Sequence, residues 1–325
     1  MSSSILGVGS PLLDVLARVD DTFLSEHIPG SKGGMEMVDS AFQQKVLASL
    51  EGNLSKAPGG SAGNTIFALA KLGAKCAMLG KLGDDSNGEF YKKYFSSLGG
   101  NVDEFVVTNQ APTGVCLSLI TPDAERTMRS DLGASLLFSE EEVYKVDFSK
   151  YDIVYIEGYM LFSSAFDAII ECASKANCRI GIDLASFEVV GIFREKLLKL
   201  LPEKISIVLA NAEEATALLG DISPENQLAK LATMCDIAAV KLGKDGALVK
   251  SGNQEYKVPA CLVEKPIDTT AAGDLWAAGF LYGLINNQTL DKAAYYGALI
   301  SGEVVKVIGS VLPESSWEYI QSKLK

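Results

Sequence analysis

Residues 268–274, Asp-Thr-Thr-Ala-Ala-Gly-Asp, place small side chains and two carboxylates directly before an apolar, helix-forming segment at residues 275–284. Small side chains before a helix leave its first backbone N–H groups open to an anion, and the helix dipole adds about half a positive charge there. A carboxylate at this point is suited to take a proton from a nucleophile beside the anion. The run therefore predicts phosphoryl transfer, with Asp274 as base and the amides of residues 272–274 holding phosphate charge. From these residues alone, the alternative is that Asp274 only caps the helix.

Composition limits the classes of protein to which this chain can belong. Its 325 residues, 48% hydrophobic and 22% charged, can bury the core of one large or two smaller domains. The net charge of −12 argues against nucleic acid and anionic membranes as partners. No apolar stretch is long enough to span a bilayer, no signal peptide is recognisable, and the six cysteines form no C-x-x-C pair. We therefore expect a cytoplasmic protein with reduced thiols and a small-molecule substrate.

The chain has a single histidine, His27. This excludes His-rich metal sites and argues against Ser-His-Asp hydrolysis, and His27 is not followed by the Arg-Asp pair of the catalytic loop of protein kinases. The partial G-x-G at residues 7–9 lacks the third glycine of a dinucleotide site, and no Walker A spacing is present. Proton chemistry must use mainly carboxylate, Lys, Tyr or Cys side chains.

Short apolar runs alternate with longer amphipathic segments along most of the chain. This order predicts a parallel sheet that is buried on both faces by helices. The expected strands are residues 5–9, 76–80, 153–157, 179–183, 206–210 and 237–241, and the expected helices are residues 61–73, 85–99, 163–176, 190–201, 212–219 and 224–235.

Another region has a different pattern. Apolar and small residues alternate over 113–120, a Pro-Asp turn follows, and residues 125–129 form a polar strand candidate. This pattern predicts a half-exposed hairpin. Residues 14–19 and 34–38 look like further short strands, and we expect all four to form a small β-lid inserted in one domain.

Polar side chains follow several of the apolar strands, at Glu157, Asp183 and Asn211. The carboxyl ends of parallel strands form the edge at which open α/β sheets bind ligands. Asn211 and Glu214 have the spacing of a helix capping box, which is compatible with a second role for Glu214 toward metal-bound water.

A second glycine cluster, residues 58–65, leads into the expected helix at 61–73, and its Asn64 offers both a donor and an acceptor. Together with residues 268–274, it resembles the two signatures of the ribokinase (PfkB) family of carbohydrate and nucleoside kinases. The resemblance covers nearly the whole chain, including residues 80–85, 211–214 and 241–246.

The resemblance implies a ribokinase-like α/β fold, a three-layer α/β/α sandwich with a mostly parallel central sheet and a small β-lid. The nucleotide-binding main domain would comprise residues 1–12, 40–105 and 131–325. The lid would comprise residues 13–39 and 106–130.

Three further segments indicate which subgroup of the family this chain resembles. Residues 9–14, 121–128 and 157–159 are most similar to bacterial adenosine-kinase-like members. The implied reaction is ATP-dependent phosphorylation of the 5′-hydroxyl of adenosine or a related nucleoside. A PfkB sugar kinase acting on ribose or fructose is the alternative substrate assignment. A catalytically weak, ligand-sensing relative is the alternative of another class. The family also leaves a homodimer open.

The resemblance assigns roles on the acceptor side of the site. Asp14 would bind paired ribose hydroxyls, with Gly60 and Asn64 beside it. Arg126 from the lid would neutralise the phosphate during its transfer to the hydroxyl that Asp274 deprotonates. The candidates for stacking a base are Tyr159, Phe162 and Phe187.

On the nucleotide side, Glu214 would organise Mg²⁺ through water, and carbonyls around Asp268 and Thr270 could hold a monovalent cation such as K⁺. Lys241 stands where the family commonly has Thr. The residues expected at the nucleotide are Asn211, Lys241, Gly243 and Gly246.

Ala271 departs from the family pattern, which usually has Gly at this point of the anion loop. We predict a negative φ for Ala271, because non-Gly residues rarely adopt positive φ. A positive φ would favour the catalytically weak alternative.

Overall fold

A computed structural model describes residues 3–30, 32–50, 54–123 and 125–324. Its larger sheet has nine strands in the order β14-β13-β12-β11-β10-β9-β1-β5-β6. The seven strands from β12 to β6 pair in parallel, and β13 and β14 add an antiparallel hairpin at one edge. The bounds are β1 Ser4–Val8, β5 Lys75–Gly83, β6 Phe105–Thr108, β9 Ile153–Glu157, β10 Arg179–Asp183, β11 Ile207–Asn211, β12 Ile237–Lys241, β13 Ala247–Ser251 and β14 Gln254–Val258.

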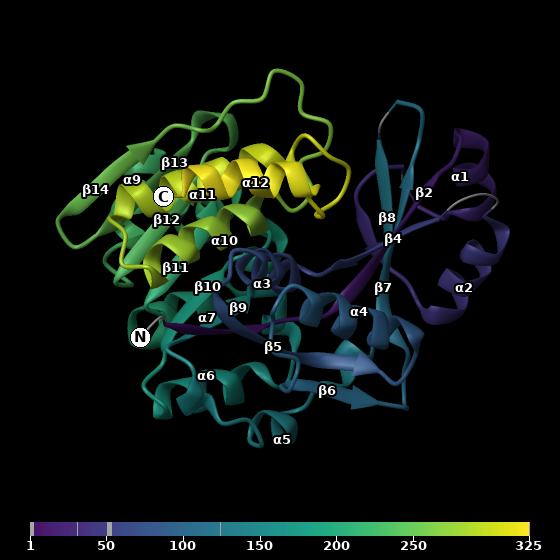
Figure 1. Ribbon diagram of the computed structural model, residues 1–325, viewed down its shortest axis with the longest axis horizontal. Coiled ribbons are helices and arrows are strands. Elements are labelled where there is room, and N and C mark those ends of the chain that lie inside the picture. Colours follow the sequence, from purple (N-terminus) through teal and green to yellow (C-terminus); the bar gives the residue numbers. More distant parts are fainter. Residues whose placement is uncertain (1–2, 31, 51–53, 124, 325) are drawn as a thin grey trace.

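Helices cover both faces of this sheet, as Figure 1 shows. On β1, Ile5 packs into one hydrophobic core while Leu6 and Val8 pack into the other, because successive side chains of a strand point to opposite faces. The first core includes residues of α3 Ser61–Lys71, α4 Ser86–Ser97, α10 Ala272–Ile285, α11 Leu290–Val304 and α12 Glu314–Lys323. The second includes residues of α5 Glu140–Val143, α6 Phe166–Lys175, α7 Phe187–Lys204, α8 Ala212–Leu219 and α9 Pro224–Leu231. The predicted three-layer architecture is confirmed.

A second sheet of five strands, ordered β3-β8-β7-β2-β4, lies beside the main body (Figure 1). Its strands are β2 Leu12–Arg18, β3 Met35–Met37, β4 Ser55–Gly59, β7 Thr113–Ile120 and β8 Arg126–Gly133. Along β2, Leu13, Val15 and Ala17 are buried in a core shared with buried residues of α1 Asp21–His27 and α2 Ser40–Ser49. The alternate residues of β2 therefore remain available on the other face.

This second sheet is larger than the expected lid. The predicted hairpin is present as β7 and β8, but β8 continues to Gly133. β4 pairs with β2, although the expected boundaries placed residues 55–59 in the main domain. Short 3₁₀ helices complete the described elements: Ala134–Leu137, Phe148–Lys150, Gly158–Phe162 and Gly243–Asp245. None of the helices within the described ranges is long and apolar enough to cross a membrane.

Candidate active site

Asp274 is the third residue of α10, and its carboxylate is directed at α3. It accepts hydrogen bonds from the Ser61 hydroxyl (2.7 Å) and from Nδ2 of Asn64 (2.9 Å). The residue that caps α10 is Ala271, without a side-chain capping bond, so the capping interpretation of Asp274 is wrong. Burial raises the pKa of Asp274 to about 6, although the bonds from Asn64 and Ser61 oppose this shift. A carboxylate with this pKa is ionised at neutral pH and still a useful base.

Ala271 has φ 59° and ψ 6°, so the prediction of a negative φ is wrong, and by the criterion stated above this angle favours the catalytically weak alternative. The carbonyl of Thr269 accepts from the Ala272 N–H (3.2 Å), which closes a turn with Ala271 in its third position. Type II turns require positive φ at that position. The Ala271 carbonyl then accepts the Leu275 N–H (2.8 Å), so the helix starts despite a left-handed residue. The alanine costs about 1 kcal/mol of backbone strain relative to glycine.

The turn decides which amides can bind an anion. The Ala272 N–H is used inside the turn, whereas no described residue accepts a hydrogen bond from the N–H groups of Gly273 and Asp274. These two donors lie at the positive end of the α10 dipole and face a cavity of about 340 Å³. The predicted anion hole of residues 272–274 is thus reduced to two available amides.

Charged side chains at neighbouring strand ends line the same cavity. Asp183 ends β10 and Lys241 ends β12, and the Lys241 ammonium lies 2.7 Å from Asp183 Oδ2. Although burial disfavours its charge, the carboxylates of Asp183 and Glu214 hold the pKa of Lys241 above its ordinary value. Lys241 is therefore a cation in this structure.

Asn211 and Glu214 form the predicted capping box at the start of α8. The Asn211 side chain accepts from the Glu214 N–H (2.8 Å), and Glu214 accepts from the backbone and side-chain nitrogens of Asn211 (2.8 and 2.7 Å). Burial, and then the charge of Asp183, raise the pKa of Glu214 to about 7.

Two glycines complete the wall of this cavity. Gly243 has φ 58° and Gly246 has φ 92°. A Cβ on Gly246 would lie 2.0 Å from the carbonyl oxygen of Val258. Gly246 therefore brings the loop after β12 close to the end of β14.

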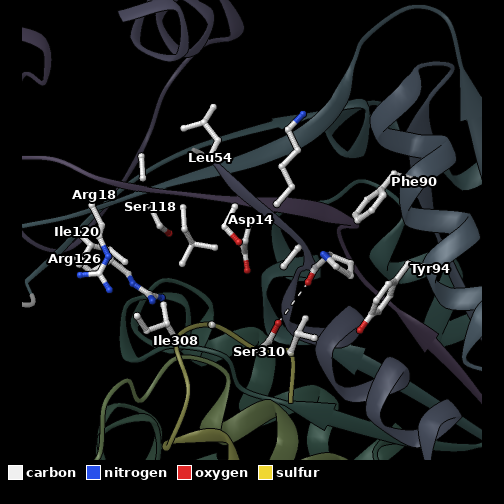
Figure 2. A pocket seen from close by; sticks show the side chains of 18 residues that line it. Asp14, Arg18, Leu54, Phe90, Tyr94, Ser118, Ile120, Arg126, Ile308 and Ser310 are labelled. Atoms are coloured by element: carbon white, nitrogen blue, oxygen red, sulfur yellow. Dashed lines mark hydrogen bonds between the residues drawn. The ribbon is translucent and has the colours of Figure 1, made fainter. Parts of the chain in front are cut away.

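A second cavity, of about 700 Å³, lies between the lid sheet and the main domain. Figure 2 shows Asp14 pointing into it, with Phe90 and Tyr94 of α4 on one side and Arg18 and Arg126 on the opposite side. Leu16 of β2 also lines this cavity, because it lies on the same face of the strand as Asp14 and Arg18. Burial raises the pKa of Asp14 to about 6, against the opposing effect of the Arg126 charge.

The glycine cluster allows Asp14 and α3 to approach each other. A Cβ on Gly59 would lie 2.6 Å from the Asp14 carboxylate, and one on Gly60, which has φ 86°, would lie 2.3 Å from the Ser10 carbonyl oxygen. The buried Glu157 carboxylate fixes both segments, because it accepts from the N–H groups of Ser10 and Ala62 (2.8 Å each).

Arg126 connects the lid to the anion loop. Its guanidinium donates to the Asp268 carboxylate and to the Thr270 hydroxyl. Asp268 also accepts from the N–H groups of Thr270 (2.9 Å) and Gly309 (2.8 Å). With both side chains engaged in this way, a monovalent cation at this point would need backbone carbonyls as ligands.

Comparison with known proteins decides the family. The pattern described as pfkB family carbohydrate kinase matches residues 35–317. The chain belongs to this family. The structure matches adenosine kinase from Sinorhizobium meliloti with a TM-score of 0.87 and 31% identity, and a probable sugar kinase from Rhizobium etli CFN 42 with 0.86 and 30%; each match covers 100% of both chains. Adenosine kinase 2 of Arabidopsis thaliana is 26% identical over 333 residues, covering 95% of this chain and 96% of the relative.

Membership in the pfkB family confirms the predicted family and enzyme class. The protein is a phosphotransferase that acts on an alcohol group and uses ATP. Two cavities are candidate substrate sites: we refer to the 340 Å³ cavity, which contains the candidate anion-binding amides, as the nucleotide cavity, and to the 700 Å³ cavity as the acceptor cavity.

The residues of this pfkB family member fit a hydrated Mg²⁺. Asp183 and Glu214 carry carboxylate oxygens of the kind that Mg²⁺ prefers, both engaged by protein donors, and Mg²⁺ usually keeps several of its waters. Within the described ranges there is no group of three or more His, Cys, Asp or Glu side chains that could bind a metal directly. Water-mediated binding through Glu214 is consistent with both observations.

The expected stacking residues Tyr159, Phe162 and Phe187 do not line the acceptor cavity. Phe90 and Tyr94 do, and they lie near each other on α4 with ring centroids 6.4 Å apart. The sequence carried a usable signal, since aromatic residues four apart share one face of a helix. Nothing in the sequence indicated that this face of α4 meets the lid.

Proposed function

We propose that this kinase transfers the γ-phosphoryl group of ATP to the 5′-hydroxyl of adenosine or a related nucleoside. The observation that carries the proposal is the composition of the 700 Å³ cavity. It combines a carboxylate, Asp14, with an aromatic side formed by Phe90 and Tyr94. A ribose offers paired hydroxyls to a carboxylate, and a base offers a flat face to aromatic rings. A free sugar offers the same hydroxyls and only a smaller C–H face to aromatic rings.

In the proposed mechanism Asp274 takes the proton of the attacking hydroxyl, and Ser61 and Asn64 orient its carboxylate. The new bond forms between the acceptor oxygen and phosphorus, and the bond to the β–γ bridging oxygen of ATP breaks. The Gly273 and Asp274 amides stabilise phosphoryl charge. Arg126 brings a further cation from the lid to the same loop.

Nucleotide and ion roles complete the proposal. Asn211, Gly243 and Gly246 line the nucleotide cavity, and they would contact ATP there. Mg²⁺, held through water by Glu214, supplies charge neutralisation to the phosphates when bound. K⁺ binding by carbonyls near Asp268 and Thr270, a cytoplasmic location and a homodimer stay predictions.

An acceptor screen tests the function. We expect ADP release with saturable dependence on adenosine, and weaker turnover of 2′-deoxyadenosine because it lacks one of the hydroxyls assigned to Asp14. Ribose and fructose should be poor substrates in the same assay. Turnover of ribose or fructose without turnover of any nucleoside would transfer the assignment to a sugar kinase. Binding without turnover of any acceptor would support the catalytically weak alternative.

A sugar phosphate is the second candidate acceptor. Arg18, Lys56 and Arg126 all line the cavity, and Figure 2 shows the two arginines together on the side opposite the aromatic residues. Cations grouped in this way could bind a phosphate that the acceptor already carries. Fructose 6-phosphate therefore belongs in the screen. If it is the preferred acceptor, Arg18→Ala should raise its KM while leaving the KM for ATP unchanged.

A further inference from the structure

Lys241 ends β12 beside the anion loop of α10. Its ammonium lies 2.7 Å from Asp183 Oδ2, and a Cβ built on Gly273 would lie 3.4 Å from Nζ. Gly273 has no side chain, so the ammonium is separated from the first amides of the helix by backbone atoms of this residue alone. The side chain of Lys241 is 12% exposed and lines the nucleotide cavity.

The Asp183 carboxylate is itself held in place. Its Oδ1 accepts from the Ala185 N–H (3.2 Å), and its Oδ2 accepts from Lys241. Ala185 has φ 67°, a left-handed conformation that turns the backbone back toward the carboxylate. Asp183 therefore fixes the position of the ammonium, which the flexible four-carbon stem of lysine would otherwise leave variable.

Two cations reach the anion loop from opposite parts of the molecule. Arg126 of the lid bonds to Thr270, and Lys241 of the main sheet lies next to Gly273. A transferring phosphoryl group spreads its charge over three equatorial oxygens, so charge on more than one side of it lowers the barrier. Arg126 depends on the lid, whereas Lys241 is part of the sheet and is present before any acceptor binds.

We infer that Lys241 is a catalytic residue whose ammonium, positioned by Asp183, contacts the phosphoryl group as it passes from ATP to the acceptor. It neither donates nor accepts a proton: the hydroxyl proton goes to Asp274, and Lys241 stays charged throughout. The inference rests on phosphoryl transfer in this cavity and not on the nucleoside assignment. The competing explanation is that Lys241 only neutralises the buried Asp183.

A double-mutant cycle separates the two explanations. We expect Lys241→Met to lower kcat about 100-fold, the usual effect of removing one preorganised charge donor. The variant with both Lys241→Met and Asp183→Asn contains no unpaired buried carboxylate at this point, so it should fold even if the single variant does not. The asparagine amide oxygen can still accept from the ammonium but holds it less strongly, so we expect the kcat of the double variant to remain about tenfold below that of Asp183→Asn alone. Lys257→Met removes an equal charge from exposed β14 and should change nothing.

A binding measurement adds a readout that needs no acceptor. Calorimetry with AMP-PNP and with ADP compares nucleotides with and without a γ-phosphoryl group. Loss of Lys241, measured in the background of Asp183→Asn, should weaken AMP-PNP binding about tenfold and ADP binding less than twofold. The inference would be overturned if the double variant had the same kcat as Asp183→Asn. It would also be overturned if the loss of Lys241 weakened the binding of AMP-PNP and of ADP equally. Failure of adenosine as acceptor would contradict the nucleoside assignment and leave this comparison intact.

Discussion

In the main sheet, the charged side chains of the site lie at the ends of strands, as Asp183 and Lys241 do, whereas in the lid Asp14 and Arg18 lie on β2 itself. The main sheet is covered by helices on both faces, so a polar side chain reaches a ligand only where a strand ends. The lid has one face packed against α1 and α2 and the other turned to the acceptor cavity. The main sheet is therefore suited to hold reacting groups at one edge, and the lid is suited to recognise an extended ligand along a surface.

If this division is correct, a change at Asp274 affects the chemical step most. Asp274→Asn keeps the size and most hydrogen-bonding capacity of the side chain but cannot accept the proton, so kcat should fall by about 100-fold or more. Steady-state kinetics should show little change in the KM for the acceptor. Asp291→Asn, which alters another first-turn aspartate on α11, should keep full activity. A kcat within a few-fold of the unmodified enzyme would remove Asp274 from the mechanism.

The pH dependence of kcat sharpens the same point. The pKa of Asp274 is raised to about 6 by burial, so the carboxylate gains a proton as the pH falls through that value. Protonated Asp274 is no base, and kcat should decline about tenfold per pH unit below about 6. Asp274→Asn should lack this decline. A kcat that is flat from pH 7 to pH 5 would contradict the assignment of the base.

Changes in the lid should act on acceptor binding. Asp14→Ala should raise the KM for adenosine by about 10- to 100-fold, since ligand hydroxyls then lose a charged partner worth about 1–3 kcal/mol. The KM for ATP should change little. Glu26→Ala removes an exposed carboxylate on the outer helix of the lid and serves as the control. An effect of Asp14→Ala on kcat alone would show that the lid takes part in the chemistry as well.

The smallest effect is expected at the strained alanine. Ala271→Gly should raise the free energy of unfolding by about 0.5–1 kcal/mol, because glycine adopts the left-handed conformation without strain. Ala272→Gly, one residue later and inside the helix, should lower it by a similar amount. Chemical denaturation measures both changes. We expect kcat of Ala271→Gly to rise by no more than a few-fold, and a hundredfold rise would support the catalytically weak alternative.

Sequence patterns alone predicted the family, the layered fold and most of the residues that line the smaller cavity, but of the residues that line the larger cavity they predicted only Asp14 and Arg126. Apolar strands between amphipathic helices implied a sheet covered on both faces, and the small residues before α10 implied an anion site, because both follow from local preferences. The capping box of Asn211 and Glu214 was predictable for the same reason.

Only the tertiary structure decided how distant segments meet. The left-handed Ala271 depends on a turn that must connect the fixed Asp268 to the start of α10, and a single-residue preference could not indicate it. The pairing of β4 with β2, the aromatic side of the acceptor cavity formed by Phe90, and the contact between Lys241 and Asp183 all join residues far apart in the chain. Such contacts depend on the packing of whole elements, and local sequence does not encode which faces of these elements come together.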